Sequence, residues 1–305
     1  MAKKTKKNKL DRYIDALHQI DNKLVIITGA NSGLGFEMAK VALIKGARVV
    51  MACRNKQRAE DARQKIIEET GKDNIEIFLY DQSDIKSVHN FAAAIKNQYK
   101  DFYALVLNAG VMFPPQVVDE YHVSTVYRVN FLGAYALMKD LEDFLNYATE
   151  EKRIIIQGSL ATYLHKYKNK DKFIYGDYRP FKQYCLSKLC CSNIFAHYRD
   201  NNKNENVKYL LCEPGAAATE IVKSFKPWFK KIAQAFVATF NNSAKKGCLD
   251  GCKLMCDDCV NGDYYKPRCF FSLVGMPKKA KYPRRYIFPS ILSDADEMIK
   301  QYEQR

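Results

Sequence analysis

The feature that most constrains the fold of this 305-residue chain is a glycine-rich turn directly after a run of apolar residues. Residues 24–27 are four consecutive apolar residues, which predicts a parallel strand buried on both faces of a sheet. The chain must then turn sharply and begin a helix near Gly33. Gly29 permits the turn, Gly33 lets the backbone approach a phosphate, and Gly35 lets helix and strand pack closely. The N–H groups at the start of that helix are expected to face an anion.

Segments with strand-like and helix-like patterns alternate along the chain. Strands are expected at residues 47–54, 75–80, 103–107, 153–157 and 207–212, and helices at residues 10–22, 33–45, 58–70, 85–99, 123–147 and 184–199. This alternation predicts an α/β fold, a single-domain Rossmann-type doubly wound parallel sheet with helices on both faces. We expect a basic tail and short helix over residues 1–20, the main domain over 21–290 and a C-terminal helix over 291–305.

Composition narrows the classes of protein to consider. Hydrophobic residues make up 47% of the chain, and no run approaches the ~18 apolar residues that cross a bilayer. Ten cysteines without a secretory signal favour free thiols in a reducing compartment, so we expect a cytoplasmic location. The formal charge of +15 invites a nucleic-acid partner. Because no RNA-binding or helix-turn-helix pattern accompanies the charge, we expect none.

Two residues suited to acid–base chemistry stand four positions apart in a predicted helix. Tyr184 and Lys188 therefore share one helix face. Reduction of a carbonyl needs a proton donor at the oxygen and a hydride at the carbon. The pKa of a free tyrosine, about 10, is too high for efficient catalysis near neutrality, and a lysine ammonium nearby lowers it. Taken alone, such a pair is more often an ordinary pair on a helix surface.

Six short segments occur in an order that resembles the short-chain dehydrogenase/reductase family. They are residues 28–35, residues 108–110, Asn130, Ser159, Tyr184 with Lys188, and Pro214 with Gly215. The resemblance covers about residues 22–220, and residues 52–55 are similar to the retinol-dehydrogenase-like branch of the family. It implies an enzyme, a short-chain alcohol dehydrogenase or carbonyl reductase that uses NAD(P).

The resemblance implies roles for single residues. Tyr184 would exchange a proton with the substrate oxygen, Ser159 would hold that oxygen, and Lys188 would also bind the nicotinamide ribose. Asn130 would hold a water in a proton relay. The implied cofactor-binding residues are Gly29, Asn31, Ser32, Gly33, Leu34, Gly35, Arg54, Asp81, Gln82, Asn108, Ala109, Gly110, Tyr184, Lys188, Pro214, Gly215 and Thr219.

Arg54 decides the choice of cofactor at this stage. It ends the second predicted strand, where proteins that bind NAD usually place an acidic residue for the ribose hydroxyls. A planar guanidinium suits a 2′-phosphate instead. We therefore expect NADP(H) to be preferred, with NAD(H) as the alternative cofactor. The competing interpretation is that Arg54 merely lies on the surface and binds no phosphate.

The chain departs from the family pattern around the substrate site. Ser159 and Tyr184 are 25 positions apart, a longer gap than in many members, and this insertion is expected to form a wall of the pocket. His165, within it, is either a second acid–base group or an exposed loop histidine. Phe131 and Gln157 stand where many family members have other residues. Glu213 stands where the retinol-dehydrogenase-like branch often has another residue. These departures concern the substrate rather than the reaction.

Two later segments admit more than one interpretation. Aromatic and basic residues around Trp228 recur at helical spacing, which indicates either a mobile substrate lid or a basic helix on a membrane surface. Cys248, Cys252, Cys256 and Cys259 could suggest zinc. Because the first three form a stripe on one helix face, buried thiols are the ordinary interpretation, and we expect no metal.

The leading hypothesis is an NADP(H)-dependent oxidoreductase that interconverts a carbonyl and an alcohol on an apolar small molecule. The alternative is a catalytically quiet NADP-binding regulatory protein on the same fold, against which the intact Asn130, Ser159, Tyr184 and Lys188 argue. A third hypothesis is a nucleic-acid- or membrane-surface protein that uses the positive charge. Substrate identity, direction and oligomeric state stay open at this stage, as does contact with a membrane surface.

Overall fold

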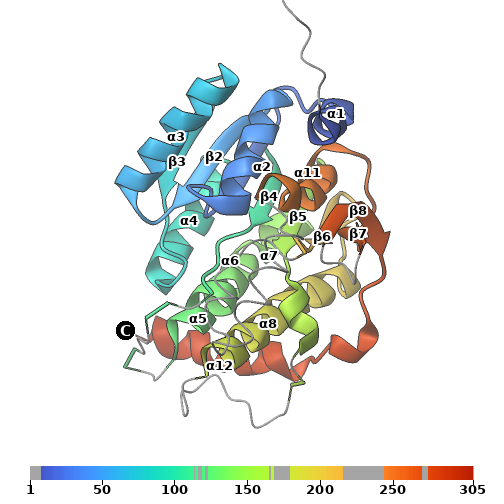
Figure 1. The fold of residues 1–305 in the computed structure, drawn as a ribbon. Helices are drawn as coiled ribbons and strands as arrows, with labels where there is room; N and C mark the ends of the chain where they lie inside the picture. The colour runs from blue at the N-terminus through green and yellow to red at the C-terminus, as the bar shows by residue number, and fades with distance from the viewer. Residues whose placement is uncertain are drawn as a thin grey trace, which may run out of the picture.

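An eight-stranded sheet forms the centre of the molecule. The computed structural model describes residues 8–112, 114–115, 119–120, 123–164, 166–167, 179–215, 244–269 and 274–304. The strands lie in the order β3-β2-β1-β4-β5-β6-β7-β8 (Figure 1). All neighbours pair in parallel except β7 and β8, which are antiparallel. The predicted α/β class with a mostly parallel sheet is confirmed.

The elements alternate along the chain much as the sequence predicts. The strands are β1 (Leu24–Thr28), β2 (Arg48–Cys53), β3 (Ile75–Leu79), β4 (Phe102–Leu107), β5 (Lys152–Gln157), β6 (Val207–Cys212), β7 (Tyr264–Cys269) and β8 (Val274–Ala280). The helices are α1 (Lys9–Ala16), α2 (Gly33–Ile44), α3 (Lys56–Thr70), α4 (Ile85–Asn97), α5 (Thr125–Tyr127), α6 (Gly133–Asp140), α7 (Glu142–Asn146), α8 (Pro180–Asp200), α10 (Ala244–Gly247), α11 (Leu249–Cys256) and α12 (Ser290–Glu303). Shorter turns are η1 (Arg128–Leu132), η2 (Leu160–Leu164) and η4 (Arg284–Tyr286).

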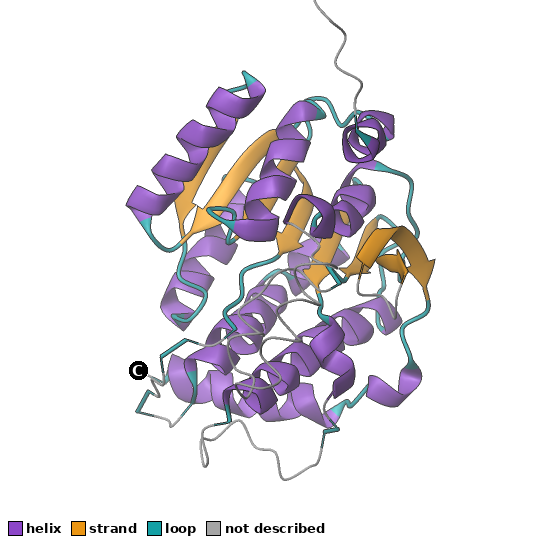
Figure 2. Cartoon of the chain, viewed as in Figure 1, coloured by secondary structure: helices purple, strands orange, loops and turns teal. Residues whose placement is uncertain are grey.

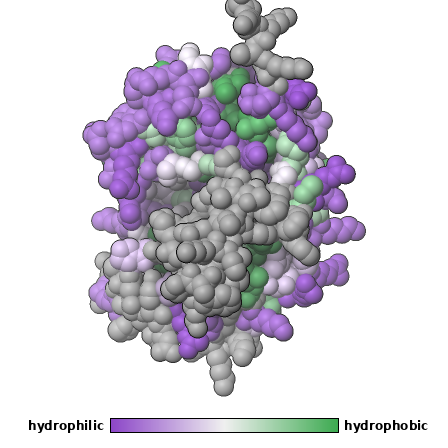
Figure 3. Space-filling view, viewed as in Figure 1, coloured by the Kyte–Doolittle hydropathy of each residue, from purple (hydrophilic) through white to green (hydrophobic). Residues whose placement is uncertain are grey.

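Helices cover both faces of the sheet and bury its side chains (Figure 2). One core joins the sheet to α4, α6, α8 and α12, and the other joins it to α2, α3 and α11. Every residue of β1 and β4 is buried, as expected of central parallel strands. Away from the core, hydrophilic side chains cover α3 at the upper left of Figure 3. Among the described helices, none has the length and hydropathy that crossing a bilayer requires.

Two helix predictions need correction. The helix expected at 123–147 is divided into α5, a π-helical turn η1, α6 and α7. Asn130 lies in η1, where its side chain bonds the backbone of Val111, so a tertiary contact accompanies the irregular turn. The helix expected at 10–22 ends at Ala16, because Leu17 is extended and buried in the core.

Strand order determines where a ligand can lie. The chain moves outward from β1 to β3, then crosses back to place β4 on the other side of β1. The loops after β1 and β4 therefore leave the sheet in opposite directions and open a crevice at the carboxyl ends of the strands. In open α/β sheets, ligands bind at this position.

Candidate functional site

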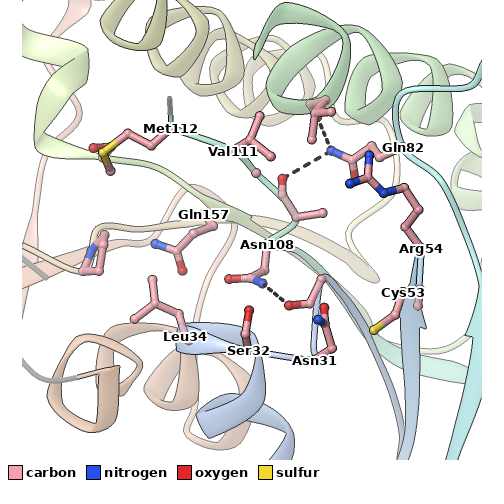
Figure 4. Close-up of a pocket in the computed structure, with 18 of the residues that line it drawn as sticks. Asn31, Ser32, Leu34, Cys53, Arg54, Gln82, Asn108, Val111, Met112 and Gln157 are labelled. Carbon is pink, nitrogen blue, oxygen red and sulfur yellow. Dashed lines mark hydrogen bonds between the residues drawn. The ribbon is translucent and has the colours of Figure 1, made fainter. Parts of the chain in front are cut away.

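A cleft of about 490 Å³ lies at this crevice. Figure 4 shows Arg54 and Gln82 toward one end and Met112, Gln157 and Leu34 toward the other, with Ser32, just before α2, between them. The cleft brings together most of the residues that the sequence predicts for a site: Gly29, Asn31, Ser32, Gly33, Leu34, Arg54, Asp81, Gln82, Asn108, Ala109, Gly110, Ser159, Tyr184, Lys188, Pro214 and Gly215. Gly35 and Asn130 lie just behind its lining, and Thr219 is outside the described residues.

The three glycines of the first turn have separate structural reasons. Gly29 has φ +68°, and a Cβ there would lie 2.9 Å from the Cα of Ala109. Gly33 has φ +59°, and a Cβ would meet nothing within 4 Å. The backbone at Gly33 therefore borders open space at the start of α2, where N–H groups can receive an anion.

Gly35 is a packing glycine, so a methyl group there should destabilise the protein. A Cβ would lie 2.5 Å from Asn108 Nδ2 and 2.6 Å from the carbonyl oxygen of Gly29. We expect Gly35→Ala to lower the free energy of unfolding by about 1–3 kcal/mol, measured by urea denaturation. Gly251→Ala is the matched control, because its new methyl would meet the flexible end of Met38. Equal stability of Gly35→Ala and wild type would contradict the packing role.

Thr28 and Asn108 tie the first turn to the end of β4. The Thr28 hydroxyl oxygen accepts hydrogen bonds from the backbone N–H groups of Asn108 and Ala109, at 3.0 and 2.9 Å. It also donates to the carbonyl oxygen of Val106 at 3.3 Å. The Asn108 side-chain amide donates to the carbonyl oxygen of Thr28 at 2.9 Å. These bonds hold two strand ends in register on either side of the cleft.

Gln82 lines the cleft, yet its amide is used within the protein. Its Nε2 donates to the carbonyl oxygens of Ala109, at 3.3 Å, and Val129. The backbone carbonyl oxygen of Gln82 also explains why a glycine follows η1, since a Cβ at Gly133 would lie 1.9 Å from it. Gln82 thus connects the loop after β3 to the wall of the cleft.

Cations gather at the Arg54 end of the cleft. Arg54 is exposed, and its Nη1 lies 4.0 Å from Asp81 Oδ2. The other oxygen of Asp81 accepts hydrogen bonds from the Ser83 N–H and hydroxyl at 2.9 and 2.6 Å. Arg58, in the first turn of α3, lines the same end. Arg58 was not predicted from the sequence, although its position in the first turn of the helix that follows Arg54 could have indicated it.

Ser159, Tyr184 and Lys188 line the same cleft. The Tyr184 hydroxyl donates a hydrogen bond of 3.4 Å to Ser159 Oγ, and both residues are buried. Lys188 Nζ donates to the carbonyl oxygen of Gln157 at 3.2 Å. A Cβ at Gly110 would lie 3.5 Å from Lys188 Nζ, so the glycine gives the ammonium room. The phenol and ammonium of α8 thus line one cleft with the hydroxyl of Ser159, which lies between β5 and η2.

Asn130 supports this group from behind. Its Oδ1 accepts from the N–H of Val111 at 2.7 Å, and its Nδ2 donates to the Val111 carbonyl oxygen at 2.8 Å. The same Nδ2 donates to Ser187 Oγ at 3.0 Å. Because Ser187 precedes Lys188, Asn130 connects the loop after β4 to α8.

No metal centre forms in the part of the chain that the structure describes: no three His, Cys, Asp or Glu side chains come together as a ligand group. All ten cysteines are free thiols and nine are buried. Cys248, Cys252, Cys256 and Cys259 lie on or next to α11 and belong to the core that joins the sheet to α2, α3 and α11. Burial raises the pKa of Cys256 to about 12, as expected of a packed thiol. His165 and the segment around Trp228 lie outside the described residues.

Comparison with known sequences places this cleft in context. The sequence model of the short chain dehydrogenase family matches residues 23–230. Human retinol dehydrogenase 11 is 30% identical over 237 residues, which cover 74% of this chain and 72% of that protein. The WW domain-containing oxidoreductase of Gallus gallus is 34% identical over 178 residues, 56% of this chain and 43% of that protein. The chain spans less than half the length of the WW domain-containing oxidoreductases that it matches.

Solved structures show the same fold. An uncharacterised protein from Mycobacterium paratuberculosis superposes with a TM-score of 0.72 at 22% identity, covering 95% of this chain and 97% of that one. A short chain dehydrogenase from Shigella flexneri complexed with NADP superposes with a TM-score of 0.59 at 17% identity, covering 79% of this chain and 94% of that one.

Proposed function

Because this chain belongs to the short-chain dehydrogenase family of NAD(P)-dependent oxidoreductases, we propose that it interconverts a carbonyl and an alcohol on an apolar small molecule with NADP(H). The observation that carries the proposal is the convergence of Ser159, Tyr184 and Lys188 beside the glycine turn, in one cleft. A protein that only senses the cofactor has no need of all three groups at the site of hydride transfer.

The residues of the cleft fit a dinucleotide phosphate. Open space beside Gly33, at the start of α2, suits the pyrophosphate, and the Ser32 side chain does not cap the helix there. Arg54, directly after β2, and Arg58, in the first turn of α3, suit a 2′-phosphate, because each can present a planar fork of donors. The start of α2 would therefore hold the pyrophosphate of NADPH, and the two arginines would hold its 2′-phosphate. Lys188 would hold its nicotinamide ribose.

The reacting groups have separable tasks. Bound NADPH supplies a hydride to the carbonyl carbon of the substrate. Tyr184 gives its hydroxyl proton to the carbonyl oxygen, and Ser159 donates a hydrogen bond that keeps this oxygen in place. Lys188 places positive charge near the phenolate that remains. Asn130 holds the loop after β4 through Val111 and holds α8 through Ser187, the residue before Lys188.

The described wall beside Tyr184 favours an apolar substrate. Ala161, Tyr184 and Cys185 form a small buried cluster, against which Met112 and Phe181 pack. Met112 also lines the cleft. Human retinol dehydrogenase 11 acts, by its name, on retinol, which is an apolar alcohol. An aldehyde or ketone on a hydrocarbon skeleton would match this wall better than a sugar or an amino acid.

A substrate screen tests the proposal. NADPH oxidation should be followed with nonanal, all-trans-retinal, a ketosteroid and, as a polar comparison, glyceraldehyde. We expect turnover with at least one apolar carbonyl and little with glyceraldehyde. Tight NADPH binding without reduction of any of them would favour the regulatory alternative over an enzyme.

Cofactor choice gives a separate prediction. Arg54→Asp removes a charge-assisted hydrogen bond to the 2′-phosphate, which should cost about 1.5–3 kcal/mol, or at least a tenfold weaker Kd for NADPH. The Kd for NADH should change much less. Lys56→Asp is the matched control, because it makes the same change of charge two residues away without lining the cleft. Both Kd values can be measured by fluorescence titration. If the ratio of the Kd for NADPH to the Kd for NADH were the same in Arg54→Asp and wild type, the role of Arg54 would be disproved.

A further inference from the structure

A buried carboxyl group lies directly behind the catalytic serine. Glu213 directly follows β6 and is only 1% exposed to solvent. Tyr163 of η2 donates its hydroxyl proton to Glu213 Oε1 at 2.9 Å. The hydroxyls of Tyr163 and Tyr264 are 2.8 Å apart. Since a phenol has only one proton, Tyr264 must donate this second bond. We name Tyr163, Glu213 and Tyr264 the carboxyl–tyrosine cluster.

The carboxyl–tyrosine cluster holds both sides of the chain around Ser159. On one side, a Cβ at Gly158 would lie 3.3 Å from Glu213 Cγ, so the carboxyl side chain packs directly against the residue before the serine. On the other side, Tyr163 belongs to η2, whose Ala161 N–H donates to Ser159 Oγ at 3.2 Å. The ring of Tyr163 is further fixed by an edge contact with Tyr286, with centroids 5.0 Å apart.

The surroundings of Glu213 favour its uncharged form. Burial raises the pKa of this carboxyl, and the hydroxyl groups of Tyr264 and Tyr163 beside it and the charge of Lys266 on β7 oppose the rise. Other titratable groups that the charge of Glu213 affects are Asp250 on α11, which is also a buried carboxyl, Cys212 of β6 and Tyr282. Glu213 Oε2 has no hydrogen-bond partner among the described residues, which would be costly for an ionised group.

We propose that Glu213 is a positioning residue, which in its uncharged form anchors Tyr163 and thereby sets the position of the Ser159 hydroxyl. The inference rests on the proposed function, in which Ser159 holds the substrate oxygen. It assigns a role to a glutamate at a position where the retinol-dehydrogenase-like branch often has another residue. A displacement of the serine by a fraction of an ångström is enough to slow a reaction that depends on alignment.

Turnover of all-trans-retinal and nonanal by single variants tests the positioning role. Tyr163→Phe and Glu213→Ala should each lower kcat about tenfold, while the Kd for NADPH stays within about twofold of wild type. Glu213→Gln should keep kcat near wild type, because its amide oxygen still accepts the Tyr163 proton. Tyr209→Phe, a buried phenol on β6 outside the cluster, is the matched control. A Tyr163→Phe variant with wild-type kcat would overturn the proposal, even if Glu213→Ala failed to fold.

A double-mutant cycle separates positioning from general damage. In a Ser159→Ala background, Tyr163→Phe should have no further effect on kcat, since the hydroxyl that it positions is gone. An undiminished tenfold loss in that background would show that Tyr163 acts elsewhere, and would also overturn the proposal.

A third measurement does not depend on turnover. Because the folded-state pKa of Glu213 is raised, its stabilising contribution is present at pH 4 and is lost as pH rises through that pKa. Unfolding by urea from pH 4 to 8 should therefore show wild type losing stability relative to Glu213→Gln. A constant difference would contradict the uncharged form. Should no carbonyl be reduced at all, the proposed function fails, whereas this measurement still decides the state of the carboxyl–tyrosine cluster.

Discussion

Tyr184→Phe is expected to lower kcat by at least about two orders of magnitude, the usual worth of a positioned acid–base group. The substitution keeps the ring and its packing against Ala161 and Cys185. It removes the hydroxyl that reaches Ser159 at 3.4 Å. The Kd for NADPH should stay close to wild type, because the glycine turn and Arg54 are unchanged.

A second tyrosine of α8 provides the control. Tyr198 is buried in the same helix, stacks on Tyr209 and does not line the cleft. Tyr198→Phe should therefore turn over substrate at nearly the wild-type rate. Near wild-type turnover by Tyr184→Phe, with NADPH still bound, would refute the acid–base assignment.

Lys188→Met is expected to damage both cofactor binding and rate. The ammonium lies behind Gly110 and donates to the Gln157 carbonyl oxygen, so the neutral chain loses a fixed charge in a buried setting. We expect the Kd for NADPH to rise about tenfold, from the loss of one charge-assisted hydrogen bond. The value of kcat should fall about a hundredfold, since no cation remains to stabilise the Tyr184 phenolate.

Lys182→Met is the control that shows whether replacing another lysine of α8 also changes the Kd for NADPH and kcat. Lys182 is exposed in the first turn of the helix and does not line the cleft. Its loss should leave both constants within about twofold of wild type, as for other surface substitutions. Equal effects of the two substitutions, or a Lys188→Met variant with only one constant changed, would contradict the double role.

The positions of the strands could be anticipated from sequence because buried parallel strands are continuous apolar runs. Residues 24–27 predict a buried parallel strand and residues 103–107 predict a strand, and both strands are fully buried in the structure. The break in the helix expected at 123–147 could not be anticipated. The π-helical turn there accompanies bonds from Asn130 to Val111 and the close approach of Gly133 to Gln82, which lie far away in sequence.

Some residues of the cleft could also be predicted from the sequence, and others could not. Residues such as Gly33, Arg54 and Ser159 come directly after strands, so parallel pairing alone brings them to one edge of the sheet. Met112 and Phe181 were not identified because they stand in segments without a periodic pattern. The carboxyl–tyrosine cluster depends on the pairing of β6 with β7, since Glu213 donates its N–H to Tyr265 and its carboxyl faces Tyr264. No local pattern in the sequence indicates that contact.

Isotope transfer tests the central claim most directly. Wild-type protein should be incubated with a reducible apolar carbonyl and NADPH that carries deuterium on one face of nicotinamide C4. We predict that one of the two labelled isomers gives an alcohol with a single deuterium on the carbinol carbon, found by mass spectrometry, and that the other gives none. An alcohol product without deuterium from either isomer would contradict hydride transfer from the nicotinamide in this cleft.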